Sequence, residues 1–223
     1  MTTLLISQTN GSAHATPSGH AERQERIEAA ARALDHPRFG ALMREMAAPG
    51  DLELAELVHS PKVMDTIRAI RPAEGIGQID PDTFVSARSL EASATALGGV
   101  LRGIEAVILG EAHNAFILAR PPGHHAERDR SMGFCLVNTI AIAARQAQRL
   151  YGAERVAIID FDVHHGNGTQ DIFADDPSVF YASSHQMPLY PGTGAPHERG
   201  VGNIVNAALE AGSGGQEMRA ADK

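Results

Sequence analysis

Two short segments of the chain concentrate residue types that bind metal ions and transfer protons. The segment Asp160-Phe-Asp-Val-His164 follows an apolar run and places Asp160, Asp162 and His164 at alternate positions. Alternate residues of a strand share a face, so these three side chains are expected to project together. Buried carboxylates at a strand end are costly unless a cation or hydrogen-bond donors compensate them. A carboxylate oxygen and an imidazole nitrogen suit Zn²⁺, and we therefore predict Asp162 and His164 as zinc ligands.

The second segment is a pair of adjacent histidines, His124 and His125, presented by the rigid Pro121-Pro-Gly123 loop. Amide hydrolysis needs a base for the attacking water and an acid for the leaving amine, and two imidazoles with different partners can supply both. A carboxylate such as Asp160 behind one ring would raise its pKa, whereas an amide such as Asn167 behind the other would do so less. Taken alone, such a pair is more often an ordinary pair of loop histidines.

The surrounding pattern indicates how these segments are positioned. Apolar runs of the kind that strands buried on both faces require are found at 115–119, 156–161 and 179–182. Helical spacing of apolar residues predicts helices at 21–34, 52–59, after Pro61, at 89–104 and at 136–150. A polar, histidine-bearing segment follows each strand, the third being Ser183-Ser-His185. Because ligands of open parallel sheets lie beyond the carboxyl ends of the strands, the sequence predicts one site there.

Composition limits the class of protein. A chain of 223 residues that is 43% hydrophobic can bury a core as a single domain, which we expect over residues 1–223. The formal net charge of −8 argues against binding to nucleic acid and favours a cationic or neutral substrate. The one cysteine, Cys135, excludes an internal disulfide, and we interpret it as a packed thiol in a reducing compartment. No signal peptide or membrane-spanning run is visible, so we expect a soluble cytoplasmic protein.

Longer motifs add a family resemblance. The segments that carry it are Arg120-Pro-Pro-Gly-His-His-Ala126, Met132-Gly-Phe-Cys-Leu136, Asp160-Phe-Asp-Val-His-His-Gly-Asn-Gly-Thr-Gln170, Tyr190-Pro-Gly-Thr-Gly194 and Gly19-His-Ala-Glu-Arg23. They resemble segments of the histone deacetylase family, including class II-like bacterial histone deacetylases, acetylpolyamine amidohydrolases and acetoin utilisation proteins. The resemblance implies an arginase/deacetylase-like three-layer α/β sandwich with a mostly parallel sheet flanked by helices. It also implies a single Zn²⁺ and hydrolysis of the linear amide of an acetylated lysine peptide, polyamine or other small amine, with release of acetate.

The resemblance assigns roles to individual residues. It places the zinc ligands at Asp162 and His164, the acid–base pair at His124 and His125, and the partners of that pair at Asp160 and Asn167. It makes Gly133 and Phe134 walls of a narrow acyl-lysine channel. It places a substrate-holding carboxylate at Asp80 or Asp82, where an ordinary Asx turn is an equally good interpretation. It implies a structural K⁺ site, formed largely by carbonyl groups, at Asp160, Asp162, His164, Ser183 and Ser184. His185 either backs that site or is a packed histidine at a strand end.

The chain also departs from the family pattern. A third zinc ligand, an aspartate, and a tyrosine that stabilises the transition state are both expected further along than Lys223. The domain is therefore expected to be incomplete at its C-terminus, with weakened zinc affinity. Two alternatives to a lysine deacetylase stay open, namely acetylpolyamine hydrolysis and a catalytically inactive metal-binding or interaction module. A two-metal ureohydrolase is disfavoured because Gly166 stands where that fold needs a carboxylate. The sequence is compatible with an oligomer.

Overall fold

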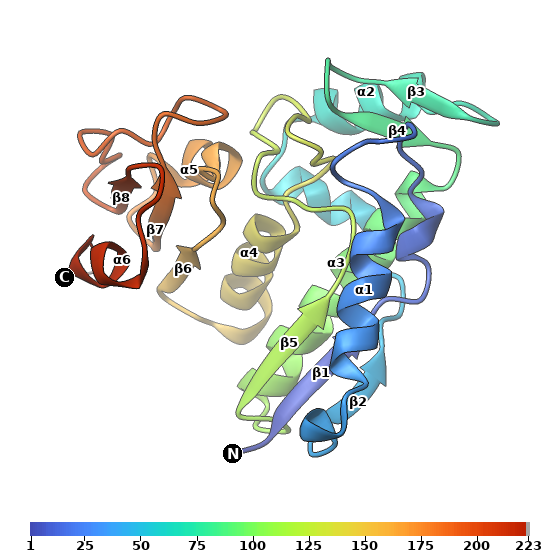
Figure 1. Cartoon of the computed structure of the whole chain (residues 1–223), viewed down its shortest axis with the longest axis horizontal. Helices are drawn as coiled ribbons and strands as arrows, with labels where there is room; N and C mark the ends of the chain where they lie inside the picture. Colours follow the sequence, from blue (N-terminus) through green and yellow to red (C-terminus); the bar gives the residue numbers. More distant parts are fainter. Residues whose placement is uncertain (222–223) are drawn as a thin grey trace.

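A computed structural model describes residues 1–221 as an α/β protein in which helices pack on two separate parallel sheets (Figure 1). The first sheet has the spatial order β2 (Met43–Met46), β1 (Thr3–Ser7), β5 (Asn114–Leu118). The second has the order β6 (Val156–Asp160), β7 (Val179–Gln186), β8 (Ile204–Leu209). A small antiparallel pair is formed by β3 (Ile76–Gln78) and β4 (Phe84–Ser86). The predicted α/β architecture, with mostly parallel strands and flanking helices, is confirmed.

The helices connect and cover these strands. In chain order they are α1 (Gln24–Leu34), α2 (Pro61–Ile70), α3 (Ser89–Ile108), α4 (Thr139–Tyr151), α5 (Asn167–Phe173) and α6 (Gly215–Ala221). Short 3₁₀ turns occur at Gly11–Ala13, Pro37–Phe39 and Leu52–Leu57. Helix α4 begins where the Asn138 side chain accepts a hydrogen bond from the Ala141 amide at 3.1 Å, and it ends at Gly152 with φ 69°. None of the helices in residues 1–221 has the length and apolar composition needed to cross a bilayer.

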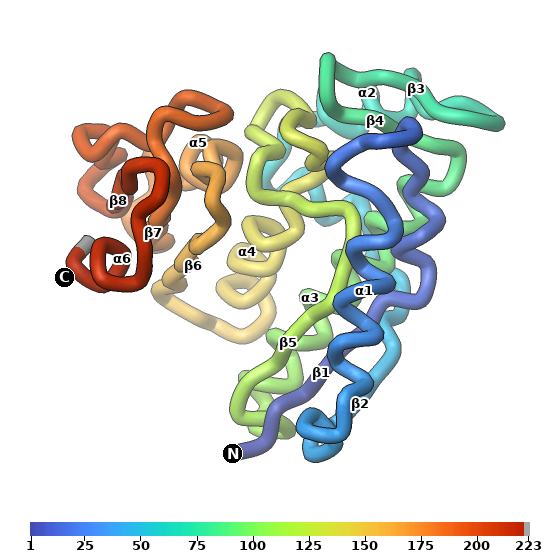
Figure 2. The backbone as a smooth tube through the Cα atoms, in the orientation of Figure 1, coloured from blue at the N-terminus to red at the C-terminus, as the bar shows by residue number. Residues whose placement is uncertain are grey.

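Helices α3 and α4 join the two sheets. They pack against each other, with α3 also on β5 and α4 also on β6 (Figure 2). The main core includes Leu97 of α3, Ile142 of α4 and Tyr181 of β7, all fully buried. Helix α3, predicted at 89–104, runs through Gly98 and Gly99 and continues to Ile108. A Cβ atom on Gly98 would lie 2.6 Å from the Gly50 amide nitrogen, so this glycine permits close packing instead of ending the helix.

A buried ion pair fixes the start of the histidine loop. The Arg120 guanidinium donates to both carboxylate oxygens of Glu22, at 2.5 and 2.8 Å, and both side chains are 3% exposed. It also donates to the carbonyl oxygens of Gly11 (2.7 Å) and His14. The Arg120 amide donates to the Gln8 side chain at 2.7 Å. One side chain therefore ties the end of β5 to segments that follow β1 and precede α1.

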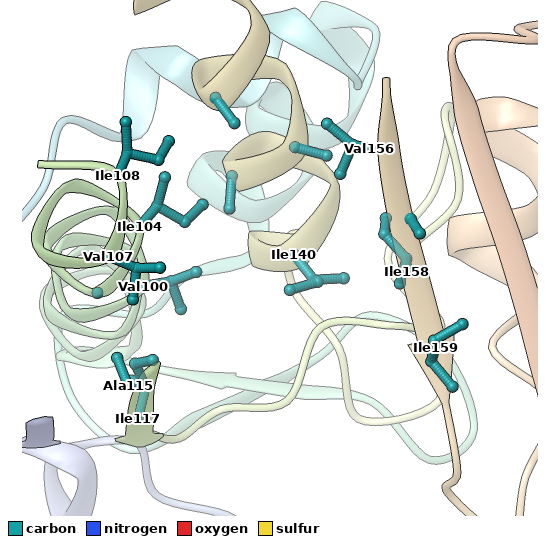
Figure 3. A pocket seen from close by; sticks show the side chains of 15 residues that line it. Val100, Ile104, Val107, Ile108, Ala115, Ile117, Ile140, Val156, Ile158 and Ile159 are labelled. Atoms are coloured by element: carbon teal, nitrogen blue, oxygen red, sulfur yellow. The ribbon is translucent and has the colours of Figure 1, made fainter. Parts of the chain in front are cut away.

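Strands β5 and β6 are edge strands within residues 1–221, since each has a single strand neighbour. Between them, α3, α4 and the two strands line an apolar groove of about 450 Å³ (Figure 3). Ile104, Ile140 and Ile159 line this groove from α3, α4 and β6 (Figure 3). Burial on both faces was expected for these strands and is wrong here. Phe116 of β5 is 51% exposed and Ile159 is 63% exposed, because no described element covers the edges on which they lie.

Two strand ends also differ from the sequence interpretation. Ser183, Ser184 and His185 were expected after a strand but lie within β7, which continues to Gln186 because β8 pairs with it. Strand β6 ends at Asp160, so Asp162 and His164 are loop residues and do not share a strand face with it. Their side chains are instead directed by the loop, in which the His164 amide donates to Asp162 Oδ1 at 2.9 Å.

Candidate active site

The loops after β5 and β6 bring the two predicted halves of the site together. His124 Nδ1 lies 2.9 Å from Asp160 Oδ2, which links the histidine loop to the end of β6. The rings of His124 and His125 have centroids 4.0 Å apart, and the ring of His164 lies 5.9 Å from that of His125. The predicted acid–base pair and the predicted ligand pair therefore face each other across a short distance.

His124 lies in an anionic environment. Its side chain is 18% exposed, and its partner Asp160 is 11% exposed. Asp160 Oδ2 also accepts from the Tyr181 hydroxyl at 3.1 Å, and Oδ1 accepts from the Asp162 amide at 3.1 Å. Burial by itself would lower the pKa of His124, but the hydrogen bond and charge of Asp160, with the charge of Asp162, raise that pKa above its usual value. Burial likewise opposes ionisation of Asp160, yet its bond to His124 brings the carboxyl pKa below the usual value.

His125 lies in the opposite environment. Its side chain is buried, and its Nδ1 atom lies 2.7 Å from Oδ1 of Asn167, a neutral group. Burial, followed by the neighbouring charge of His124, lowers the pKa of His125 to about 4. The two adjacent histidines thus have pKa values displaced in opposite directions, the arrangement expected of one charged and one neutral imidazole at neutral pH.

Asp162 and His164 present a pair of donor atoms suited to one metal ion. Asp162 Oδ1 and His164 Nδ1 lie 3.1 Å apart, and the side chains are 51% and 37% exposed. Two tetrahedral ligands about 2.0 Å from zinc would be about 3.3 Å apart, so the pair fits two positions of such a site. No group of three His, Cys, Asp or Glu side chains with metal-binding geometry occurs in the described part of the chain. A catalytic zinc site uses three protein ligands, so the predicted pair would fill two of these positions.

Of the residues predicted for potassium, Asp160 ends β6, whereas Ser183 and Ser184 lie inside β7. Ser183 pairs with Asp160 in the strand register, and Ser184 pairs with Ala207 of β8. His185 is buried, with Nδ1 2.9 Å from the Ser183 hydroxyl and Nε2 3.0 Å from the Gly194 carbonyl oxygen. The contact with Ser183 is compatible with both interpretations of His185, as a packed histidine and as a residue behind the predicted potassium site.

Of the two predicted channel walls, Gly133 lies against the His125 ring and Phe134 lies against His20. Gly133 has φ 57° and Phe134 has φ 69°, and the Phe134 ring packs edge-on against His20 with centroids 4.7 Å apart. Tyr190 was given no role from the sequence, although its segment was recognised. Its ring lies edge-on to His125, with centroids 5.1 Å apart, and 6.3 Å from His164. Only the tertiary placement of its loop reveals this contact.

The two aspartates proposed for the rim have different surroundings. Asp80 Oδ1 accepts from the amides of Asp82 and Thr83 at 3.0 and 2.6 Å, which is an Asx turn. The Thr83 hydroxyl accepts from the Phe134 amide at 3.1 Å and connects this turn to the channel wall. Burial, then the nearby Asp80, raises the pKa of Asp82. The loop therefore lies beside the predicted channel, with the Asp80 carboxylate used by its own backbone.

Cys135 packs beneath the histidine loop. It is fully buried, and the His125 amide contacts its sulfur at 3.4 Å. Burial raises the pKa of this thiol well above its ordinary range. The interpretation of Cys135 as a packed thiol is confirmed, because a nucleophile would need the opposite shift.

The apolar groove extends to the candidate site. A second cavity of about 560 Å³ shares Ile140, Ile158 and Ile159 with the groove between β5 and β6. Its other end is lined by His124 and Asp162. The catalytic histidine and one predicted ligand therefore border the open space between the two sheets.

Adding a methyl group at Gly133 is expected to displace the His125 ring. An ideal Cβ at this position would lie 2.5 Å from His125 Cδ2, in a backbone conformation that L-residues disfavour. Gly133→Ala should lower the free energy of unfolding by about 2 to 4 kcal/mol, measured by urea denaturation. Gly152→Ala is the matched control, since Gly152 also has positive φ but nothing within 4 Å of its Cβ position. Equal losses in the two variants would rule out the steric contact with His125.

Three buried histidines are expected to make the fold sensitive to acid. Burial is the first cause that lowers the pKa of each, to about 3 for His14 and about 4 for His125 and His165. Because the unfolded value is 6.5, the unfolded chain binds more protons below that pH. Stability is therefore complete above pH 6.5 and falls toward pH 4, by about 1.4 kcal/mol per pH unit for each histidine. The pKa of His124 is raised, so its contribution to stability is fully present below pH 6.5 and is lost only above that pH. It therefore does not offset the loss of stability that the three buried histidines cause on acidification.

Urea denaturation at intervals between pH 7 and pH 5 would measure this slope. His165→Gln removes one of the three histidines and should reduce the slope. A stability that stays constant over this interval would contradict the expectation.

Comparisons with known proteins agree with the motifs. A family model described as the histone deacetylase domain matches residues 20–223. An uncharacterised protein of Synechocystis sp. is 41% identical over 213 residues, which cover 93% of this chain and 69% of that protein. A probable deacetylase of Archaeoglobus fulgidus is 46% identical over 142 residues, which cover 62% of this chain and 39% of that protein.

A solved structure gives the same result at the level of the fold. The crystal structure of the HDA15 HD domain superposes with a TM-score of 0.83 and 34% sequence identity, over 93% of this chain and 61% of that one. The chain thus spans well under two thirds of the length of several proteins that it matches. The fold is arginase/deacetylase-like, as predicted. With the family model covering nearly the whole sequence and the motif residues gathered at one site, this chain belongs to the histone deacetylase family.

Proposed function

We propose that this chain carries the proton-transfer residues and two metal ligands of a hydrolase that removes an acetyl or other acyl group from the amide of a lysine side chain or related amine, releasing acetate. The observation that carries the proposal is the pair of differently partnered imidazoles beside Asp162 and His164. His124 is hydrogen-bonded to a carboxylate at 2.9 Å and His125 to an amide at 2.7 Å. Family membership supports the same reaction class.

The chemistry divides between the two histidines. His125 is neutral at neutral pH, because its pKa lies near 4, and its Nε2 atom accepts the proton of the attacking water. His124 is the charged partner, since Asp160 raises its pKa, and it supplies positive charge and a proton toward the leaving amine. Displacement of the two pKa values in opposite directions therefore separates the base from the acid.

Zinc is part of this proposal. Asp162 and His164 would hold it together with a third ligand that residues 1–221 do not provide. When bound, zinc would polarise the acyl carbonyl group and acidify the attacking water. We further propose that a K⁺ ion is held by carbonyl groups where Asp160 of β6 and Ser183 of β7 are paired in register.

Acetylated polyamines are a second candidate class of substrate. The observation in their favour is the acidic turn that contains Asp80 and Asp82, which the Thr83 hydroxyl connects to Phe134 in the channel wall. Carboxylates at a channel rim attract a cationic amine more than a neutral peptide backbone. Asp82→Asn should therefore weaken turnover of an acetylated diamine more than that of an acetyl-lysine peptide.

Metal analysis and turnover test the proposal together. The purified chain is incubated with zinc, freed of excess metal, and analysed for zinc content and for hydrolysis of an acetyl-lysine reporter and of an acetylated diamine. About one zinc per chain with release of acetate supports the hydrolase. A chain that contains neither zinc nor activity would instead be a non-catalytic module, and the proposal would be wrong for these residues.

A further inference from the structure

Glu127 makes an unexplained contact directly behind the catalytic pair. Its Oε1 atom accepts a hydrogen bond from Nδ2 of Asn167 at 2.6 Å, while Oδ1 of the same Asn167 faces His125 Nδ1 at 2.7 Å. Asn167 is buried, and the Glu127 side chain is 20% exposed. The sequence motifs gave Glu127 no role. The three residues form a continuous chain of hydrogen bonds from a carboxylate to the base.

Donor and acceptor chemistry fixes the direction of this chain. A carboxylate only accepts, so the Asn167 amide must turn its NH₂ group toward Glu127 and its oxygen toward His125. That oxygen also only accepts, so the hydrogen of the neutral His125 ring must lie on Nδ1. The lone pair is then left on Nε2, the atom that a base needs. If the amide were turned over, its NH₂ group would face Nδ1 and the ring hydrogen would move to Nε2.

Glu127 is the group able to enforce this orientation. The other contact of the Asn167 NH₂ group is the Met132 sulfur at 3.4 Å, which is a weak acceptor. Glu127 is itself held in place, because Arg130 donates to both of its carboxylate oxygens at 2.7 and 3.2 Å. Its backbone is also fixed, with the amide bonded to Arg130 and the carbonyl oxygen to His59.

The two catalytic histidines therefore differ in how a carboxylate reaches them. Asp160 contacts His124 directly and brings its charge to the ring. Glu127 reaches His125 through a neutral amide, so it can select the position of the ring hydrogen without pairing a charge with the ring.

We propose that Glu127 is a positioning residue that sets the tautomer of His125 through the orientation of the Asn167 amide. The consequence for activity rests on the proposed function, whereas the tautomer itself does not. A measurement of the His125 tautomer therefore tests this proposal whether or not the chain hydrolyses any substrate.

Nuclear magnetic resonance of the ¹⁵N-histidine-labelled chain provides that measurement. Long-range ¹H–¹⁵N spectra at pH 7.5 distinguish the protonated from the unprotonated ring nitrogen, and the His125 signals are assigned by their absence from His125→Ala. The unchanged chain should carry its hydrogen on Nδ1. A hydrogen on Nε2 in the unchanged chain would overturn the proposal before any variant at position 127 is made.

Variants separate the positioning role from a general structural one. Glu127→Ala should shift His125 toward the Nε2–H form, whereas Glu127→Gln, which keeps an acceptor oxygen, should retain Nδ1–H. Glu154→Ala is the control, because Glu154 is exposed and far along the chain from this network. An Nδ1–H signal that persists unchanged in Glu127→Ala would show that Glu127 does not set the tautomer.

A double variant gives a stricter test. Asn167→Asp in the Glu127→Ala background places a carboxylate next to His125, and a carboxylate accepts in either orientation. Nδ1–H should therefore return without Glu127, and its failure to return would contradict the mechanism. If the chain hydrolyses the reporter, kcat should fall roughly 10- to 100-fold in Glu127→Ala with a smaller change in KM. Loss of Nδ1–H without loss of activity would refute the role of His125 while leaving the tautomer proposal intact.

Discussion

Replacing His125 with alanine is expected to reduce hydrolysis of an acetyl-lysine reporter by roughly 10²- to 10⁴-fold, the usual contribution of a general base. The ring is buried and neutral, hydrogen-bonded to Asn167, and 5.9 Å from the ring of His164. It is the only imidazole of the tandem pair with a lowered pKa, so His124 cannot take over as base without first losing its own proton. Initial rates with the reporter at pH 7.5 measure the loss.

Zinc content separates catalysis from metal binding in this experiment. The bound zinc of His125→Ala should equal that of the unchanged chain, because the predicted ligands are Asp162 and His164. Asp162→Ala should lose both zinc and activity. His113→Ala is the matched surface control, since His113 is exposed and its side chain hydrogen-bonds to Thr2, near the start of the chain. Undiminished turnover in His125→Ala would refute its role as base.

Replacing Arg120 with methionine is expected to lower the free energy of unfolding by about 3 to 5 kcal/mol, the usual cost of breaking a buried ion pair. Glu22 would keep a buried charge without its partner, and the carbonyl oxygens of Gly11 and His14 would lose their donor. Methionine preserves much of the side-chain volume, so the loss reports on unpaired polar groups more than on a cavity. Urea denaturation of the unchanged protein and of Arg120→Met, analysed with the same dependence of the unfolding free energy on urea concentration, measures this loss.

An exposed arginine provides the comparison for that measurement. Arg88 pairs with Glu91 at 2.9 Å, and its side chain is 61% exposed, so Arg88→Met should cost less than about 1 kcal/mol. The double variant Arg120→Met/Glu22→Leu should recover part of the stability because it removes the unpaired carboxylate. A loss below about 1 kcal/mol in Arg120→Met would show that water reaches Glu22 and that the pair is not buried in solution.

The parts of the site that could be predicted from the sequence are those carried by local patterns. The apolar run at 156–161 indicated β6, and the helical spacing at 136–150 indicated α4. The chemistry-bearing residues Asp162 and His164 directly follow the first of these runs. The partners of the two histidines were also predicted, because Asp160 and Asn167 lie in one motif beside the ligand pair. The structure brings these residues together through hydrogen bonds of 2.9 and 2.7 Å.

Other features depend on contacts between distant segments. Strand β2 (Met43–Met46) has no strand-like alternation and exists because it pairs with β1. Tyr190 reaches His125 only through the path of the loop after β7. The close approach of the backbone at 48–50 to Gly98 inside α3 is also a contact between distant segments. The hydrogen bond from Asn167 to Glu127 joins the start of α5 to the segment that follows the tandem histidines, and no sequence spacing predicts this contact.

The division of the strands into two sheets has a mechanical consequence. The predicted acid–base pair follows β5 in one sheet and the predicted ligand pair follows β6 in the other, so within residues 1–221 no continuous backbone ladder sets their separation. Their alignment rests on the packing of α3 against α4 and on hydrogen bonds between the loops, including those from His124 to Asp160 and from His125 to Asn167. A productive site needs its groups held within about 0.5 Å. A group that filled the groove lined by Ile104, Ile140 and Ile159 would therefore contact the elements that position the predicted site, without contacting the predicted catalytic residues themselves.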